Sequence, residues 1–489
     1  MGLLRRPQRS APVLVSQADI AEVEAAREVE QASADPPPGS SSPRSDIGVV
    51  EASTRPAIRR LLVSASGTAV LQGASGVMGF VLAVLLARFL GSTGYGIYAL
   101  AFAWSMFLLT PAILGLNTFL VRGIAVYEVG EQWSLMKGLL FRTNQLVLLT
   151  STTIAACGAI VAVTWLPSSS RGPFCVAMLL VPITALTLLR QGAMQAFGRV
   201  VKGQLPEFLI RPLLIIIGVV ALQLVGRLTP TTALGANVAG VAVAFVVGAL
   251  FLKRTIPAGL RSVRPEFVTR EWLRASLPMM LIAGVWAANN YATTLLVGAL
   301  DGSRAAGVYS VVQKAAEVIV LVLIATNMPL APAIARLHAR GDQQGLEHTT
   351  EQMARATLFV SAPMAVALMV FPHLYLDLFG ASFQTGATAL VILALGQLIN
   401  AAAGPSGNVL LMTGQERIAV RGVAAGLVAN VVLAIVLVPP LGVTGGAIAF
   451  AASLVLWNTT LVVLARRQVG INVTAFKRLS LQSRARSGS

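Results

Sequence analysis

The chain has 489 residues, of which 55 % are hydrophobic and only 12 % are charged, and its mean hydropathy is +0.75. An ordinary soluble domain carries roughly 25 % charged residues, so this composition excludes a water-soluble globular protein. The net charge of +17 does not indicate nucleic-acid binding, because the basic residues occur in short segments between apolar runs and form no continuous face.

The sequence gives no indication of a metal site or of an ATP-binding site. The histidines, His338, His348 and His373, lack metal-ligand spacing, and no GxxxxGK[ST] loop is present to hold ATP. Cys157 and Cys175 fall in or beside apolar runs, which favours packing over a disulfide. We therefore expect no metal site, no cofactor and no catalytic residue.

Residues 1–60 precede the first apolar run and are rich in Ser, Pro and Ala. The segment DPPPGS at 35–40 cannot support a packed core, so a disordered cytoplasmic tail is predicted. A single capped helix over 16–34 that binds a partner is the alternative.

Long apolar runs fill most of the remaining chain, and a helix needs roughly 20 such residues to cross a bilayer. In the first half they lie near 61–90, 96–121, 143–166, 173–198, 208–228 and 231–252. In the second half they lie near 276–299, 305–335, 356–380, 386–412, 418–438 and 443–465. The predicted fold is all-α and integral to the membrane, with about twelve transmembrane helices.

These runs define the expected domain organisation. After the tail of residues 1–60 we predict a six-helix bundle over 61–253, a basic cytoplasmic linker over 254–275, a second six-helix bundle over 276–465 and a basic cytoplasmic tail over 466–489.

Lys and Arg residues are concentrated in alternate loops. The intervening loops hold little beyond Arg171, Arg227 and Arg304, so the positive-inside rule places the basic loops and both termini in the cytoplasm. The outer connections, such as 167–173 and 439–446, leave no room for an extracellular catalytic domain. The function is therefore expected to lie within the bilayer.

The two halves of the chain resemble each other. Residues 91–98, GSTGYGIY, align without a gap with residues 302–309, GSRAAGVY, and Asn117 and Asn327 follow at almost the same offset. Each copy has six helices, an even number, so both have one orientation and are expected to be related by an axis along the membrane normal. Parallel repeats of this kind place a substrate site between the bundles.

Four segments carry a resemblance to a known family: LGSTGYGIYAL at 90–100, the stretch 307–337 ending APAIARL, NVLLMTGQER at 408–417, and 430–448 ending PPLGVTGGAI. Over roughly residues 58–470 the chain resembles the oligosaccharide and polysaccharide exporter branch of the multidrug/oligosaccharidyl-lipid/polysaccharide (MOP) flippase superfamily.

The resemblance implies a V-shaped, MATE-like pair of six-helix bundles in the bacterial inner membrane. It implies that the protein moves undecaprenyl-diphosphate-linked oligosaccharide repeat units to the periplasmic leaflet by alternating access, for exopolysaccharide, capsule or O-antigen synthesis. The implied partners are membrane lipids, a polysaccharide polymerase and a chain-length regulator, and proton or sodium coupling is implied without a cofactor.

A diphosphate that crosses the membrane needs cations and hydrogen bonds, because an unpaired charge at low dielectric is costly. Polar residues roughly midway through their helices are therefore cavity candidates. They are Gln72, Asn290, Gln313, Lys314, Glu317, Gln397 and Asn400.

Lys314 is the sharpest candidate, because it lies too deep in its helix to reach the membrane surface easily. Glu317 is three residues further on the same helix face, so the two can form an internal ion pair instead of a substrate site. Glu317 is also the candidate for proton coupling.

Arginines near the inner helix ends are candidates for diphosphate capture through bidentate hydrogen bonds. Arg122, Arg142 and Arg421 belong to this group, and Arg190 and Arg211 are added to the substrate-binding candidates because they lie within apolar runs. The alternative is that such arginines only satisfy the positive-inside rule and bind lipid headgroups.

The main alternative function is a multidrug or organic-cation antiporter of the same superfamily, which favours acidic residues in the cavity. Here cations outnumber acids in the membrane. A glycan polymerase or ligase needs an outer catalytic loop, and a non-transporting scaffold leaves Lys314, Gln397 and Asn400 without a role.

Overall fold

A computed structural model describes residues 46–257, 259–327 and 330–476 of the chain. Two compact units are distinguished, Met1–Leu62 and Val63–Ser489, and the second is described here. Every regular element in the described ranges is helical, which confirms the predicted all-α class. Residues 1–45 of the predicted N-terminal tail and residues 477–489 of the predicted C-terminal tail lie outside the described residues. Helix α2 begins at Asp46.

We use the term first lobe for the elements from α2 to α9. They are α2 (Asp46–Ile113), α3 (Leu116–Val129), α4 (Trp133–Trp165), α5 (Ser168–Met178), α6 (Leu180–Ala196), α7 (Val200–Leu205), the π-helix η1 (Pro206–Ile210), α8 (Arg211–Leu224) and α9 (Pro230–Thr255).

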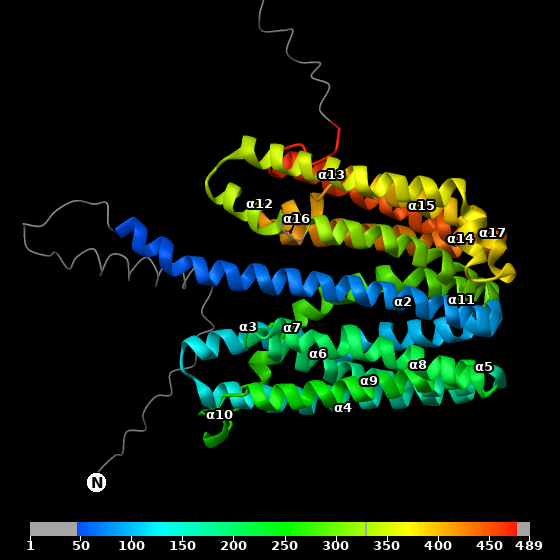
Figure 1. The fold of residues 1–489 in the computed structure, drawn as a ribbon, viewed down its shortest axis with the longest axis horizontal. Helices are drawn as coiled ribbons and strands as arrows, with labels where there is room; N and C mark the ends of the chain where they lie inside the picture. The colour runs from blue at the N-terminus through cyan, green and yellow to red at the C-terminus, as the bar shows by residue number, and fades with distance from the viewer. Residues whose placement is uncertain (1–45, 258, 328–329, 477–489) are drawn as a thin grey trace, which may run out of the picture. The chain divides into compact units, whose positions relative to one another are not determined.

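The short α10 (Gly259–Ser262) connects to the second lobe, the elements from α11 to α17. They are α11 (Thr269–Asn327), α12 (Leu330–Ala339), α13 (Gln343–Val370), α14 (Pro372–Asp377), the 3-10 helix η2 (Ala381–Gly386), α15 (Ala387–Ala403), α16 (Ser406–Met412) and α17 (Glu416–Gln468). Figure 1 shows α13 to α17 in one layer and α3 to α9 in another, with their long helices nearly parallel.

Nine helices in the described part of the chain are long and apolar enough to cross a membrane. Three of them contain a glycine with non-helical backbone angles, at Gly91, Gly302 and Gly442. These three spans are 63, 52 and 51 residues long, far more than the roughly 20 that one crossing needs. If each is divided at its glycine, the nine become the predicted twelve.

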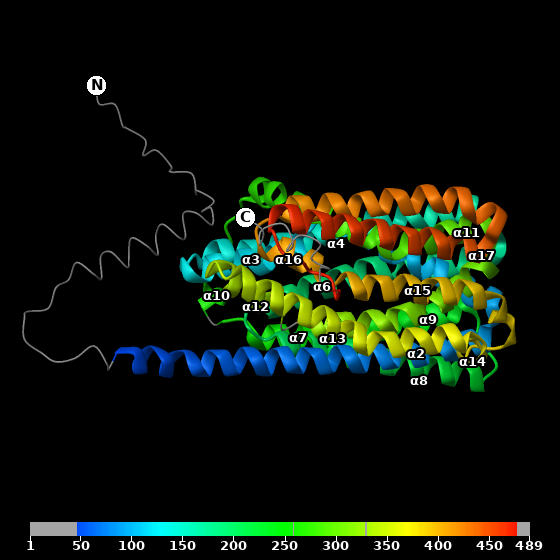
Figure 2. The same cartoon turned by 90° about the horizontal axis from the view of Figure 1, so that it is seen from above.

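The two repeats reverse direction in the same way. Gly91 has φ 67° and ψ 177°, and Gly302, its counterpart in the repeat, has φ 87° and ψ 177°. Only glycine adopts such angles without strain, so the residue type at these two positions is dictated by the turn. We call the end of the second unit that contains these glycines the turn end, and the opposite end the basic end; both views show α14 at the former and α10 at the latter (Figures 1 and 2).

The hydrophobic cores differ between the two ends. At the turn end a single core combines Tyr95 and Tyr98 of the first lobe with Val308 and Phe383 of the second. Toward the basic end there are two further cores. One surrounds Leu120 of the first lobe and also includes Trp272 of α11, and the other, around Val409, lies in the second lobe. Because buried apolar area is the main cohesive force, the lobes are held together by the shared core at the turn end, and the first turns of α11 are also packed against the first lobe.

Some helix boundaries differ from prediction. Helix α4 begins at Trp133 and not near 143, and α13 begins at Gln343 and not near 356. The added turns carry charged residues such as Lys137 and Glu347, which a hydropathy criterion leaves out. The run predicted over 386–412 is interrupted at Gly404, whose φ is 72°.

Candidate functional site

A charged pair lies at mid-depth on the second arm of α11. The Lys314 ammonium donates to Glu317 Oε2 at 2.6 Å, so the ion pair anticipated from their spacing is present. The two residues follow Gly302 by about 18 and 22 Å along the helix, near the middle of a bilayer core of about 30 Å. Their side chains are 36 % and 51 % exposed, so the pair is not sealed within its lobe and remains accessible.

Two of the other cavity candidates adjoin this pair. Gln313 Oε1 accepts a hydrogen bond from Thr294 at 2.9 Å, and its amide donates to the Asn290 carbonyl at 3.0 Å. These bonds connect the two arms of α11 at the depth of Lys314. The Asn290 side chain is exposed, whereas its backbone holds Gln313 in position.

Gln397 and Asn400 belong to a different group. Asn400 donates to Gln397 at 3.1 Å and accepts from Asn458 at 2.9 Å, which links α15 to α17. Gln397 is only 3 % exposed, and Lys314 takes no part in this chain of amides. Gln72 on α2 is half-buried and makes no side-chain hydrogen bond with a described residue. A cavity role for these three residues stays a prediction.

A second charged cluster is buried in the first lobe. Arg211 is ion-paired with Glu207 and donates to Asn237 Oδ1 at 3.1 Å, and the Asn237 amide donates to the Tyr98 hydroxyl at 3.0 Å. The Arg211 and Glu207 side chains are 16 % and 11 % exposed. Four elements, α2, η1, α8 and α9, therefore meet at one polar chain in the interior.

Arg190 lies beside this cluster and is 4 % exposed. Its Nη1 donates to the Gly203 carbonyl at 3.3 Å, while Nε and Nη2 have no partner among the described residues. Glu207 Oε2 is also unpartnered, and Arg190 interacts with Glu207 electrostatically. With two guanidinium groups and one carboxylate, the cluster has an excess of positive charge.

Two tyrosines lie within electrostatic range of the charged groups of both lobes. Tyr98, at the end of the first-lobe chain, interacts electrostatically with both Arg211 and Lys314. Tyr291 of the second lobe interacts with Lys314, Glu317 and Arg211. Tyr98 and Tyr291 therefore lie within electrostatic range of both the Arg211 cluster and the pair of Lys314 and Glu317, which belong to different lobes.

Glu207 was missed by the sequence reasoning, which named Glu317 as its candidate carboxylate within a span. The predicted helix began at 208, whereas the apolar span extends over Val200–Leu224 through the π-helix. A local signal was available, because Glu207 and Arg211 are four residues apart, the spacing at which opposite charges pair on a helix.

The capture candidates have separate surroundings. Arg122 and Arg421 are exposed. Arg142 donates to the Thr269 hydroxyl and to Gln145, each at 3.2 Å, so it holds the start of α11 against α4. The two pockets described below are lined neither by these three arginines nor by Lys314. Their part in diphosphate capture stays a prediction.

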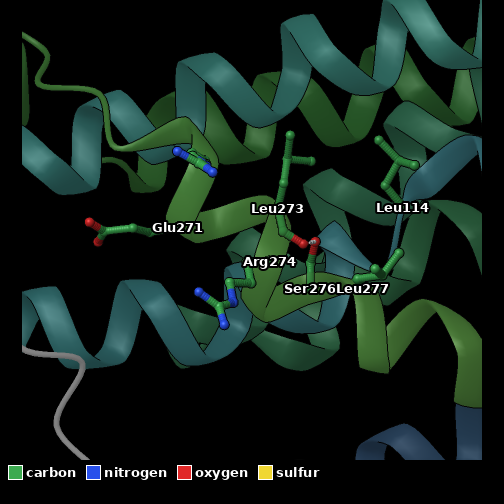
Figure 3. A pocket seen from close by; sticks show the side chains of 7 residues that line it. Leu114, Glu271, Leu273, Arg274, Ser276 and Leu277 are labelled. Atoms are coloured by element: carbon green, nitrogen blue, oxygen red, sulfur yellow. Dashed lines mark hydrogen bonds between the residues drawn. The ribbon is translucent and has the colours of Figure 1, made fainter.

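A pocket of about 740 Å³ opens near the basic end, between the α2–α3 junction at Leu114 and the first turns of α11. Arg270 and Arg274 line it together with Glu271. Figure 3 shows the charged groups of Glu271 and Arg274 on one side of the pocket and Leu114 on the other. The spacing of Arg270 and Arg274, four residues on one helix, is a signal that the sequence reasoning did not use.

No group of three or more His, Cys, Asp or Glu side chains within the described ranges is placed to hold a metal ion. The chemistry that the site offers is therefore that of ammonium, guanidinium, carboxylate and amide groups. Such groups bind anions and polar ligands and carry protons.

Two lobes of long apolar helices with charged side chains at mid-depth define a multi-pass integral membrane protein. The chain matches the polysaccharide biosynthesis protein family over residues 61–338 and belongs to that family. The MatE family also matches, over residues 278–436. An uncharacterized membrane protein of Methanocaldococcus jannaschii is 22 % identical over 201 residues, and the chain spans about 40 % of that relative.

Solved structures have the same fold. An inward-facing multidrug-resistance MATE family transporter of the MOP superfamily gives a TM-score of 0.69 at 14 % identity, covering 82 % of this chain and 98 % of that one. The lipid II flippase MurJ, in an inward closed conformation, gives 0.62 at 14 % identity, covering 81 % and 87 %. A MOP superfamily transporter from Pyrococcus furiosus gives 0.57 at 13 % identity, covering 83 % and 95 %. These matches confirm the predicted MATE-like architecture.

Proposed function

We propose that this protein is a flippase that moves undecaprenyl-diphosphate-linked oligosaccharide repeat units across a bacterial inner membrane by alternating access. In this proposal the basic end faces the cytoplasm and the lobes separate there to admit the substrate. Membership of the polysaccharide biosynthesis protein family supports the substrate class.

One observation carries the proposal: an accessible lysine, Lys314, at mid-depth in an apolar chain. A cation held there is costly unless it meets an anion, and the diphosphate supplies one during passage. Tyr98 and Tyr291 lie within electrostatic range of both Arg211 and Lys314, which supports a path with cations from both lobes. Between substrates, Glu317 serves as the counter-ion of Lys314.

The second candidate function is a multidrug or organic-cation antiporter, which the MatE match favours. The balance of charge argues against it. The two clusters contain three cations, Arg190, Arg211 and Lys314, but only two carboxylates, Glu207 and Glu317. A positively charged drug would meet net repulsion along this path.

The first experiment deletes the gene in its own bacterium and measures lipid-linked glycans in inner-membrane extracts by mass spectrometry, together with surface polysaccharide. We expect single repeat units to accumulate and the polymer to disappear, and the wild-type gene to restore it. Lys314→Ala at normal protein level is expected to restore less polymer, with Lys253→Ala at a span end as the control.

Unchanged lipid-linked glycans and surface polysaccharide, in a strain without a second flippase, would exclude the proposal. The antiporter would then be tested by survival of the deletion strain on cationic dyes. Coupling to protons through Glu317 belongs to the same proposal, as do cytoplasmic termini and association with a polymerase and chain-length regulator.

A further inference from the structure

A second basic pocket lies at the basic end of the first lobe, and its lining shares no residue with the Arg270 and Arg274 pocket. It has a volume of about 630 Å³. Three cations line it from three places: Arg199 before α7, Lys202 on α7 and Arg254 in the last turn of α9. Within the described ranges, none of these three side chains makes an ion pair or hydrogen bond.

The pocket has excess positive charge. Glu128 is the one acidic side chain among its lining residues, against the three cations. Cations brought together from separate elements repel one another, so the arrangement is more stable when an anion occupies the pocket. The occupant that this charge selects is an anion with several oxygen acceptors, such as a phosphate group.

The depth of the pocket matches the membrane surface. The apolar span of α9 ends at Thr255, directly after Arg254, and the preceding span begins at Val200, directly after Arg199. Phe197 and Phe251 belong to the same lining. Cations beside apolar side chains at the end of a span are the surroundings of a lipid headgroup and its first methylene groups.

The apolar surface next to the pocket indicates where the occupant comes from. On α9, Val243, Val246 and Leu250 are 45 %, 56 % and 52 % exposed. Their spacing places them on one helix face, which reaches Arg254 one turn later. Exposed apolar side chains along a membrane span face lipid, so the pocket is reached from the bilayer.

We propose that this pocket binds the phosphate headgroup of an anionic glycerophospholipid, with one acyl chain along the α9 stripe. Arg199, Lys202 and Arg254 hold the phosphate. Arg190 fixes the same segment from the inside through the Gly203 carbonyl, so a bound lipid and a buried arginine secure α7 from its two sides. The inference does not depend on which substrate the protein transports.

The test measures lipid binding to the purified full-length protein in detergent by native mass spectrometry and by thermal unfolding. Phosphatidylglycerol is titrated, with phosphatidylcholine and inorganic phosphate as separate arms. Arg199→Gln/Arg254→Gln is compared with the matched Arg270→Gln/Arg274→Gln variant of the other pocket. A third variant, Glu128→Gln, removes the carboxylate and keeps all three cations.

Phosphatidylglycerol is expected to bind more tightly than phosphatidylcholine and to raise the melting temperature. Arg199→Gln/Arg254→Gln weakens its binding about 10- to 30-fold, while the Arg270→Gln/Arg274→Gln variant retains it. Glu128→Gln tightens binding, and this readout keeps the test valid if the double variant is poorly folded.

Three results would overturn the inference. Equal binding of the two lipids would remove the role of headgroup charge. An equal loss in both double variants would reduce the effect to general surface charge. Stabilisation by inorganic phosphate alone, at the concentration where phosphatidylglycerol acts, would make the site one for a soluble anion.

Discussion

Gly96 of the first repeat and Gly307 of the second are equivalent positions, and they pack backbone against backbone. A Cβ atom added to Gly96 would overlap the Ser303 carbonyl and lie 3.0 Å from the Gly307 nitrogen. One added to Gly307 would overlap the Ser92 carbonyl and lie 3.0 Å from the Gly96 nitrogen. Ser92 and Ser303 are themselves equivalent, so the contact is reciprocal and the repeat symmetry passes through it.

Alanine at either glycine is expected to separate the lobes at the turn end. Gly96→Ala and Gly307→Ala each lower the free energy of unfolding by about 1–3 kcal/mol, because the clash is with rigid backbone. Gly235→Ala on α9 is the control, since no atom lies within 4 Å of its added Cβ. Thermal unfolding in detergent measures all three, and a Gly307→Ala protein as stable as the control would contradict the packing.

Arg88 connects the lobes at the same end. Its Nε donates to the Leu378 carbonyl at 2.7 Å and its Nη2 to the Asp377 carbonyl at 3.3 Å. We expect Arg88→Met to increase the population in which the turn end is open. Spin labels at the exposed residues Thr93 and Thr385 would then give a larger fraction of long distances in pulsed electron resonance.

The control for this measurement is Arg171→Met. Arg171 also donates to a backbone carbonyl, that of Leu166 at 2.9 Å, but both residues belong to the first lobe. Arg171→Met should leave the distribution of distances between the two spin labels unchanged. Equal distributions for Arg88→Met and the wild type would mean that the shared hydrophobic core alone closes this end.

A double variant separates the two roles of Lys314. If Lys314 only neutralises Glu317, Lys314→Gln is defective because it leaves the carboxylate unpaired, and Lys314→Gln/Glu317→Gln recovers activity. If Lys314 binds the diphosphate, both variants remain defective. Loss of a proton carrier at Glu317 would also leave the double variant defective in complementation, so the deciding measurement is binding of a lipid-linked diphosphate to the purified protein, which needs no proton transfer. We expect Lys314→Gln and the double variant to lose this binding and Glu317→Gln to keep it, because the Lys314 side chain stays accessible beside its partner.

Glu207 is expected to be structural. Glu207→Gln leaves the buried Arg211 and Arg190 without a carboxylate, and the free energy of unfolding should fall by about 3 kcal/mol. Glu266→Gln, at an exposed position, is the matched control. Thermal unfolding at normal expression provides the measurement. A fall no larger than that of the control would mean that water or another group compensates the arginines.

Several features of the fold could be read from the sequence because they depend on long stretches of chain. An apolar run of about 20 residues requires a lipid-spanning helix wherever it occurs. The turn glycines at 91 and 302 were visible as a repeat, and both have the same left-handed conformation in the structure. The spacing of Lys314 and Glu317 predicted their ion pair, since residues three apart share a helix face.

The candidate site was less accessible to sequence reasoning. Glu207 was overlooked because a charged residue ends an apolar run, and hydropathy does not reveal that Arg211 balances it. Gln397 and Asn400 were chosen for their depth, but depth does not determine which helix an amide faces, and Asn458 on α17 binds Asn400. The pockets at the basic end combine residues of separate elements, so no single stretch of sequence predicts them.

The sequence by itself determined that this chain lies in a membrane, that it is all-helical, and that its halves repeat, because hydrophobicity, charge distribution and turn glycines act locally along the chain. The tertiary structure decided which residues meet. Gly96 packs against Gly307, and Tyr98 lies within electrostatic range of Lys314. Arg199 and Arg254 line the same pocket. Contacts between distant residues depend on the packing of whole helices, which the order of residues along one helix does not specify.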